Sequence, residues 1–250
     1  MDLSSDRPLA LKFESLGIDG DGLDIFVRAT KRRGRFVAGA DVVRAGDSVK
    51  HSSLLLEGTA CSYKRHEDGS RSILSFHHAG DFCDLLRYVL PERDGSVGVQ
   101  ALTDCSVAII DYRDMDQLLA QPKLARAFWR ATMLEAAIYR ERLTNASRGT
   151  ALEQVASLLC EQLARREAVG IGGARLPISQ IDVADATGLS VVHVNRTIQL
   201  LRSLNVLSKA SHLEVIDRKQ LAYIAKFDGR YLNMPKLLSN WTVRVEEPPV

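Results

Sequence analysis

Two neighbouring side chains in the second half of the chain have the chemistry to read nucleic-acid bases. The Asn195 amide can pair with adenine through two hydrogen bonds, and the Arg196 guanidinium can pair with guanine in the same way. From Ser190 to Leu213 the chain has no acid, although 26% of its residues are charged. Such a stretch suits phosphate groups, whose neutralisation dominates affinity for DNA. These residues therefore predict a surface that contacts a nucleic acid.

Capping residues predict two short helices around these side chains. Ser179 is a natural N-cap, and Asp182, three residues later, is well placed at a helix N-terminus. The helix over residues 180–187 should end at Gly188, a residue that readily adopts a left-handed turn. Ser190 should cap a second helix that runs to about residue 204 and carries Asn195.

The spacing within this segment is typical of a helix-turn-helix. Ala184 is small enough to let two backbones approach, and Val194 and Ile198 can face back onto the first helix. Residues 205–216 read as a hairpin, with strands at 206–207 and 213–216, which would make the unit a winged helix. An ordinary pair of core helices remains open on the helical positions alone.

The first half of the chain predicts a β structure. Between residues 36 and 112, short apolar runs are separated by glycines at 11- or 12-residue intervals: Gly46, Gly58, Gly69 and Gly80. Strands with such regular turn signals indicate an antiparallel sandwich or jelly roll. Asp68-Gly69 predicts a hairpin with a type I′ turn.

A long helix should join the two halves. Pro122 suits a helix start, and an apolar seam with 4-3-4 spacing follows at Ala127, Ala131, Leu134 and Ile138. This seam fits either a dimer helix or a helix packed on its own domain. Further helices are expected over residues 152–165 and 218–226, whereas residues 228–250 receive no assignment.

The chain as a whole resembles the cAMP receptor protein/fumarate-nitrate reduction regulator (CRP/FNR) family of bacterial transcription factors. The resemblance covers about residues 36–216 and rests on the glycine-punctuated roll, the long helix, the helix-turn-helix and the wing. Within the roll it includes Asp68-Gly69, the Gly80-Asp81-Phe82 motif and Ala101-x-Thr103-x-Cys105-x-Val107-Ala108.

This resemblance implies an α+β fold with four parts. They are a cyclic-nucleotide-binding-like jelly roll as sensor domain (1–119), a dimerisation helix (120–148), a winged helix-turn-helix DNA-binding domain (149–227) and a C-terminal extension (228–250). It also implies a homodimer joined through the seam at Ala127, Ala131, Leu134 and Ile138. The implied partners are a pseudo-palindromic double-stranded DNA site and RNA polymerase. The expected DNA contacts are Ser179, Ser190, Val191, Val192, His193, Asn195, Arg196 and Lys209.

The residues that bind cAMP in this family are not matched here. Leu85 stands where cAMP-binding members carry a glutamate for the ribose, and Gly95-Ser96 stand where they carry an Arg-Ser pair for the phosphate. Tyr139-Arg140 replace the Thr-Ser pair that contacts the purine. A buried cyclic phosphate needs a charged partner, which Arg93 would supply only if its loop slipped. We therefore expect a degenerate sensor domain that does not bind cAMP; its effector is unknown, and a chain with no ligand at all is the alternative.

Cofactors are not expected either. Cys61, Cys83, Cys105 and Cys160 lack metal-site spacing, and no cysteine lies near the N-terminus to hold the family's iron–sulfur cluster. The four are expected to be reduced and mostly buried, with a redox role for one of them as the alternative. His77-His78 could ligate haem, but strand-end polar residues are the expected interpretation.

Composition and motifs exclude several classes of protein. With 33 Lys+Arg against 31 Asp+Glu, the net charge of +2 does not suit a histone-like wrapper. No apolar stretch approaches the roughly 18 residues of a membrane span, and the N-terminus does not read as a signal peptide, so a cytoplasmic location is expected. The common catalytic motifs are absent, and no enzyme is expected. The alternative function is a regulatory module whose winged helix contacts another protein.

The recognition helix also departs from familiar members of the family. They carry a glutamate at the position of Val192, which would accept a hydrogen bond from cytosine. Valine can instead pack on a thymine methyl group. A half-site that differs from the family consensus is therefore expected, with Arg196 still reading a guanine.

Overall fold

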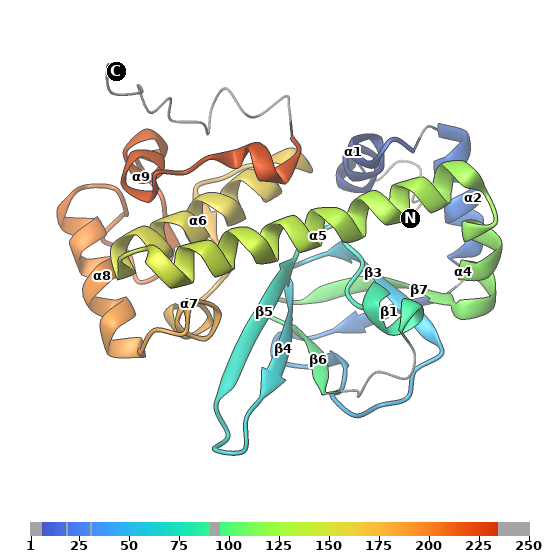
Figure 1. Cartoon of the computed structure of the whole chain (residues 1–250), viewed down its shortest axis with the longest axis horizontal. Helices are drawn as coiled ribbons and strands as arrows, with labels where there is room; N and C mark the ends of the chain where they lie inside the picture. Colours follow the sequence, from blue (N-terminus) through green and yellow to red (C-terminus); the bar gives the residue numbers. More distant parts are fainter. Residues whose placement is uncertain (1–6, 19, 31, 91–95, 235–250) are drawn as a thin grey trace. The chain divides into compact units, whose positions relative to one another are not determined.

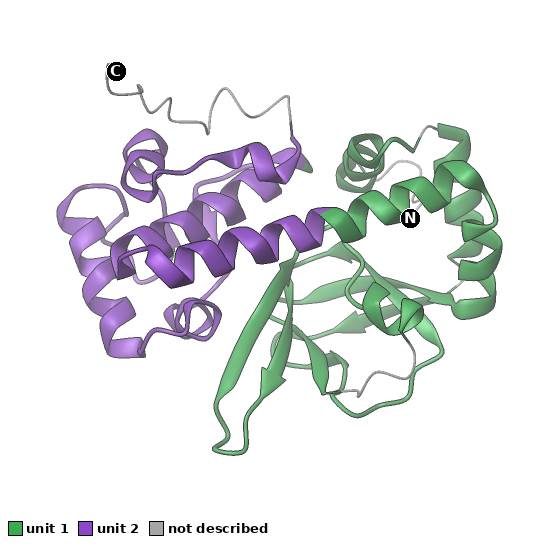
Figure 2. Cartoon of the chain, in the orientation of Figure 1, with its two compact units in different colours: residues 1–133, 169–171 green, residues 134–168, 172–250 purple. Residues whose placement is uncertain are grey.

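The structure, a computed structural model, describes residues 7–18, 20–30, 32–90 and 96–234. The chain forms two compact units (Figure 2): unit 1 comprises residues 1–133 and 169–171, and unit 2 comprises residues 134–168 and 172–250. One long helix, α5 (Pro122–Arg148), contributes residues to both (Figure 1). Among the described residues, no helix combines the length and apolarity that crossing a membrane requires.

Unit 1 is built around two antiparallel sheets, as the glycine spacing predicts. Its strands are β1 (Arg32–Phe36), β2 (Asp41–Val43), β3 (His51–Glu57), β4 (Ala60–Arg65), β5 (Arg71–His77), β6 (Val97–Ala101) and β7 (Cys105–Asp111). One sheet has the order β1-β7-β3 and the other the order β2-β6-β4-β5. Four helices accompany them: α1 (Arg7–Leu16), α2 (Gly20–Ala29), α3 (Leu85–Val89) and α4 (Tyr112–Leu119).

Strand β3 contains three consecutive leucines, Leu54 to Leu56, because both of its faces are buried. Leu55 belongs to the cluster that also contains Val99 of β6, between the two sheets. Leu54 and Leu56 point to the opposite face, where they join a cluster that includes Phe13 of α1. Because both faces of the β1-β7-β3 sheet are covered, alternation of polar and apolar residues disappears from β3.

The helices α1 and α2, which the sequence did not predict, cover the Gly80-Asp81-Phe82 motif. Lys12 of α1 is buried and forms an ion pair with Asp81, with 2.6 Å between Nζ and Oδ1. The ring of Phe82 lies 5.8 Å from that of Phe26 on α2 and 4.9 Å from that of Phe128 on α5. The motif therefore has a packing role in this chain.

The β4–β5 hairpin forms where the sequence predicts it, but its turn type differs from the prediction. A type I′ turn needs positive φ at both central residues, and Gly69 has φ +82° while Asp68 is not among the residues with positive φ. The loop is longer than two residues. The Gly69 N–H donates to the His66 carbonyl, and the Asp68 carboxylate accepts from the Ser70 N–H. This side-chain bond stabilises a loop longer than a two-residue turn, in which only Gly69 adopts the left-handed backbone conformation.

Unit 2 is mostly helical. Besides its share of α5, it contains α6 (Ala151–Ala168), α7 (Gln180–Thr187), α8 (Val191–Ser203), α9 (Arg218–Ala225) and the 3-10 helix η2 (Gly229–Leu232), with short strands β8 (Arg175–Leu176) and β9 (Leu213–Glu214). The predicted helices over 152–165, 180–187, 190–204 and 218–226 are all present. Together with unit 1, these elements confirm the expected α+β class.

The predicted wing is present, and it contains an additional short strand, β8. Leu207 and Val215 form an antiparallel bridge, and the Ser208 N–H donates to the Glu214 carbonyl. Strand β9, however, pairs mainly with β8. From the sequence, Arg175-Leu176 reads as the lead into α7, because a two-residue strand is too short to show an alternation of polar and apolar residues.

A buried carboxylate joins three elements of unit 2. Glu161 of α6 accepts from Arg142 of α5 at 2.8 Å and lies 3.4 Å from both Arg165 and the Tyr231 hydroxyl of η2. Burial alone raises the pKa of Glu161, yet Arg142 and Arg165 together hold it below its ordinary value. Tyr231 thereby links the start of the C-terminal extension to α5 and α6.

Candidate nucleic-acid interface

The first helix of the motif begins with the predicted cap. The Ser179 hydroxyl accepts from the Asp182 N–H at 3.1 Å, and the Asp182 carboxylate accepts from the Ser179 N–H at 2.8 Å. This reciprocal pair is a capping box, which satisfies two otherwise unpaired donors. The Ser190 hydroxyl caps α8 by accepting from the His193 N–H. The hydroxyls of Ser179 and Ser190 therefore already accept hydrogen bonds within the chain.

The turn between α7 and α8 has the geometry that the spacing predicts. Gly188 adopts φ +71° and its N–H donates to the Ala184 carbonyl at 2.9 Å. Ala184 is buried, and Val194 and Ile198 of α8 are fully buried. The apolar face of α8 is thus used for packing inside the unit, which leaves the opposite face to solvent.

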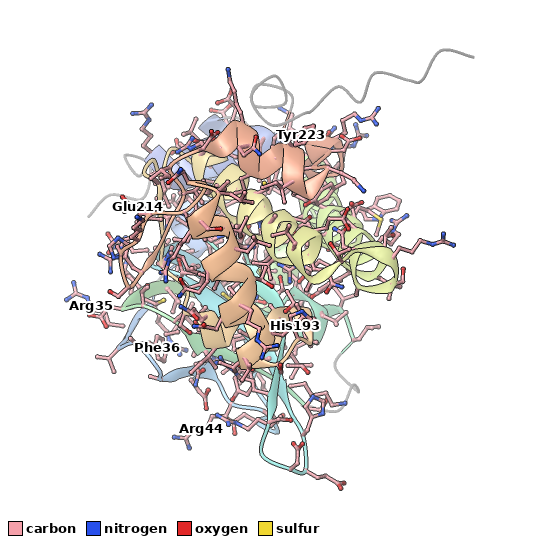
Figure 3. All side chains as sticks on the ribbon, turned by 90° about the vertical axis from the view of Figure 1, so that its left-hand side faces the viewer. Arg35, Phe36, Arg44, His193, Glu214 and Tyr223 are labelled. Atoms are coloured by element: carbon pink, nitrogen blue, oxygen red, sulfur yellow. The ribbon has the colours of Figure 1, made fainter. Side chains whose placement is uncertain are left out.

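That opposite face carries the predicted base-reading residues. Val191 and Val192 are 47% and 63% exposed, and His193, Asn195 and Arg196 are exposed as well. Figure 3 shows His193 at the surface near the N-terminal end of α8. Because these residues occupy the first turns of the helix, their side chains can reach base edges when α8 enters a major groove.

Asn195 has a partner that the sequence did not indicate. Its Nδ2 donates to Oε1 of Gln180, the first residue of α7, at 3.0 Å. Gln180 and Asn195 lie fifteen positions apart, on different helices, so no helical spacing rule relates them. No sequence signal marks Gln180 as part of this surface.

The basic residues of the acid-free stretch divide into two groups. Arg202 is used inside the chain, where its guanidinium donates to the Ser208 carbonyl at 3.1 Å and to the Ala210 carbonyl. It therefore holds the turn of the wing. Arg196 and Lys209 are exposed and, within the described part of the chain, form no hydrogen bond or ion pair through their side chains. Their charges are available to an anionic partner.

The residues predicted for the dimer seam are mostly not at the surface. Ala127 is 1% exposed and belongs to a core cluster of unit 1, against which Ala131 also packs. Ile138 is 3% exposed and Leu134 is partly buried. As a correction, burial within the chain removes Ala127 and Ile138 from the residues available to a second chain. The exposed apolar side chains of α5 are instead Trp129, Met133, Tyr139 and Leu143.

The candidate effector residues lie in different parts of the chain. Leu85 is buried at the start of α3, Ser96 is partly buried just before β6, and Gly95 lies outside the described residues. Tyr139 and Arg140 are exposed on the part of α5 that belongs to unit 2. Their assembly into one pocket stays a prediction.

A buried acid precedes Leu85. Asp84 is 6% exposed, and its Oδ1 accepts from the Ser53 N–H at 2.9 Å. Its Oδ2 and the nearby hydroxyls of Ser52 and Ser53 have no partner at hydrogen-bonding geometry. Burial raises the pKa of Asp84 to about 6, although the bond from the Ser53 N–H, the nearness of the Ser52 and Ser53 hydroxyls and the charge of Arg87 oppose the shift.

A separate cleft of about 730 Å³ opens elsewhere in unit 1. Its lining includes residues 46–50, Arg87, Leu90 and residues 111–113, but not Leu85 or Ser96. Arg87 donates to the Asp47 carbonyl at 2.8 Å and also to the Val97 carbonyl, so its charge is already used to hold the chain together. The cleft therefore does not reproduce the predicted effector pocket.

The four cysteines are buried, as the sequence predicts. Cys61, Cys83, Cys105 and Cys160 are buried free thiols. Burial raises the pKa of Cys105 and that of Cys160, which disfavours the reactive thiolate. His77 is also buried, with its Nε2 2.7 Å from the Ser62 hydroxyl.

Comparison with known proteins assigns both halves of the chain. Residues 33–122 match the cyclic nucleotide-binding domain family, and residues 153–224 match the Crp-like helix-turn-helix domain family. The fumarate and nitrate reduction regulatory protein of Vibrio cholerae is 26% identical over 207 residues, which cover 81% of this chain and 82% of that protein. The transcriptional activator protein Anr of Pseudomonas protegens is 26% identical over 223 residues, or 87% of each chain.

A solved structure supports the fold. That of FixK2 from Bradyrhizobium japonicum superposes with a TM-score of 0.64 at 23% identity and covers 77% of this chain and 96% of its own. This chain and FixK2 therefore share a fold over most of their lengths. The chain therefore belongs to the CRP/FNR family of DNA-binding transcription regulators.

Proposed function

We propose that the chain regulates transcription as a homodimer that binds a pseudo-palindromic DNA site and responds to a signal other than cAMP. The observation that carries the proposal is the exposed, acid-free face of α8, on which Arg196 has no partner within the described residues. Two such helices in a symmetric dimer would read half-sites about one helical turn apart. RNA polymerase is the further partner through which such a regulator would act.

Selection of bound duplexes from a random pool tests the DNA-binding part. A palindromic consensus is expected, and a salt titration of the selected duplex should show the steep loss of affinity that phosphate contacts produce. If no sequence is enriched, the alternative function, a winged helix that contacts another protein, becomes the better account.

Arg196→Ala tests the role of the unpaired guanidinium. We expect a loss of about 1–3 kcal/mol that is confined to one base position, measured by competition between duplexes. Lys209→Ala is the matched control, because a wing lysine that contacts phosphate should weaken binding to all duplexes alike. An Arg196→Ala chain that loses affinity equally for every sequence would assign Arg196 to the phosphate backbone.

The homodimer is supported by the apolar surface of α5. Trp129 and Leu143 are 69% and 71% exposed, and Met133 is 48% exposed. Intervals of four and ten residues keep these side chains close to one face of a helix. Large apolar side chains in a row on a soluble helix indicate a contact with another helix, and a second copy of α5 is the occupant that a symmetric DNA site requires.

Met133→Glu tests this contact. A charge buried in the interface should shift the chain from dimer to monomer in sedimentation velocity. Val37→Glu is the control, because Val37 is also 69% exposed but lies outside α5. A Met133→Glu chain that remains dimeric would move the interface away from this surface.

The proposal that cAMP is not the effector rests on the charges of unit 1. Leu85 offers no acceptor for a ribose hydroxyl, and the preceding carboxyl of Asp84 would repel a cyclic phosphate when ionised. Arg87 is held by backbone carbonyls. Calorimetric titration with cAMP should show no binding at micromolar concentrations, and micromolar affinity would overturn this part of the proposal.

A further inference from the structure

A hydrogen bond connects the two helices of the helix-turn-helix at the surface expected to face DNA. Asn195 Nδ2 donates to Gln180 Oε1 at 3.0 Å, and Asn195 is exposed while Gln180 is partly buried. The helices are already held together by the buried side chains of Val183, Val194 and Ile198. The bond at the surface is additional to this buried packing.

The bond determines which atoms Asn195 presents. A side-chain amide can rotate so that its oxygen and nitrogen exchange places, and its donor–acceptor pattern then reverses. In the structure Gln180 turns its Oε1 toward Asn195, and this oxygen can only accept, so the Asn195 NH₂ group faces α7. A bond needs one donor and one acceptor, so rotation of the Asn195 amide alone would break it. One N–H and the carbonyl oxygen of Asn195 remain for an external partner.

We propose that Gln180 is a positioning residue that sets the base specificity of Asn195. With its amide fixed, Asn195 offers its remaining N–H to N7 and its carbonyl oxygen to the N6 amino group of an adenine in the major groove. Without Gln180 the amide rotates and the donor–acceptor pattern that singles out adenine is lost for part of the time. The inference rests on the proposed sequence-specific DNA binding and deepens it, because it assigns one base pair of the half-site to a pair of residues.

Arg196, next in sequence, provides an internal reference. Its side chain makes no hydrogen bond with Gln180 or with any other described residue. The guanine preference assigned to Arg196 should therefore not depend on residue 180, whereas the adenine preference assigned to Asn195 should.

The experiment measures base preference at every position of the selected half-site. Wild-type, Gln180→Ala, Asn195→Ala and Gln180→Glu chains compete for duplexes that differ by one base pair. The wild-type chain should favour an A·T pair by about 5- to 150-fold at one position. Asn195→Ala and Gln180→Ala should both lose most of this preference at that same position and keep the guanine preference of Arg196.

Gln180→Glu separates positioning from other roles. Its carboxylate can still accept from Asn195 Nδ2, so the A·T preference should persist. Its negative charge near the DNA backbone should lower affinity for all duplexes together. The Gln180→Ala/Asn195→Ala double variant should discriminate no less than Asn195→Ala alone, because the two residues act as one reader.

Four results would overturn the inference. A Gln180→Ala chain that keeps the A·T preference, or loses affinity equally for every duplex, would make Gln180 a simple structural or phosphate-contacting residue. Loss of the preference in Gln180→Glu would show that acceptance from Asn195 is not the cause. A wild-type chain that selects no sequence would overturn the proposed function as well, whereas the other results leave that function intact. Circular dichroism melting of each variant verifies that the motif is folded.

Discussion

Replacement of Asp84 by asparagine should stabilise this protein at neutral pH. The side chain is 6% exposed, and its Oδ2 has no hydrogen-bond partner. An asparagine has nearly the same shape and carries no charge. Its oxygen can keep the bond from the Ser53 N–H, and its amide can donate to the unpartnered hydroxyls of Ser52 and Ser53.

The size of the effect follows from the pKa of Asp84. Burial raises this pKa from 3.8 to about 6, so the folded chain holds the proton more tightly than the unfolded chain. Each pKa unit corresponds to about 1.4 kcal/mol. The free energy of unfolding should therefore fall by up to about 3 kcal/mol as the pH rises from below 4 to above 6, and then level off. Asp84→Asn removes this loss.

Urea unfolding of both chains between pH 5 and pH 8, followed by circular dichroism, measures the difference. Asp84→Asn should exceed wild type by up to about 3 kcal/mol at pH 8, and the gain should shrink toward pH 5. Asp24→Asn is the matched control, because Asp24 is exposed on α2 and such a surface change should stay within about 0.5 kcal/mol. A variant less stable than wild type at pH 8 would refute the reasoning, since the charged carboxylate would then be stabilised by its surroundings. A gain that is the same at every pH would refute it too.

Two further changes test unit 2. Gly188→Ala should destabilise the motif by about 1 kcal/mol, because alanine disfavours the left-handed backbone of this position. Steric conflict is not the cause, since the site has open space for a methyl group. An unchanged melting temperature would contradict the observed turn. Glu161→Gln should cost about 3 kcal/mol by leaving the guanidinium groups of Arg142 and Arg165 without a counter-charge. The urea midpoint of unfolding measures this loss. A Glu161→Gln chain with wild-type stability would show that Glu161 acts through its shape and not through its charge.

The helix-turn-helix could be predicted nearly residue by residue because its signals are local. A cap such as Ser179 acts on an N–H three residues away, and Gly188 is needed for the backbone angle of its own position. Neither signal depends on what the rest of the chain does. The same locality explains why the β4–β5 hairpin was predicted while its turn type was wrong: Asp-Gly is compatible with more than one loop, and the bond from Ser70 to Asp68 selects the wider one.

The surface of α5 could not be predicted in the same way. The 4-3-4 spacing from Ala127 to Ile138 correctly indicates a helix with an apolar stripe. Spacing alone does not say whether that stripe meets another chain or the chain's own core. In the structure Ala127 packs with Phe128 in unit 1, on a core that includes the unassigned helices α1 and α2. The spacing left both possibilities open, and only the family resemblance favoured the dimer. Without α1 and α2 in the prediction, the core of unit 1 that covers Ala127 was not visible.

The surface expected to face DNA contains two kinds of residue, those that contact bases themselves and those that act through a neighbouring side chain. Asn195 and Arg196 could be found because their side-chain chemistry matches base edges regardless of their neighbours. Gln180 has no such signature, and the role proposed for it follows only from the packing of α7 against α8, which brings its Oε1 to 3.0 Å from Asn195 Nδ2. A residue that acts through another side chain becomes visible only when the tertiary structure is known. Specificity in this motif should therefore be sought on the first helix as well as on the helix that enters the groove.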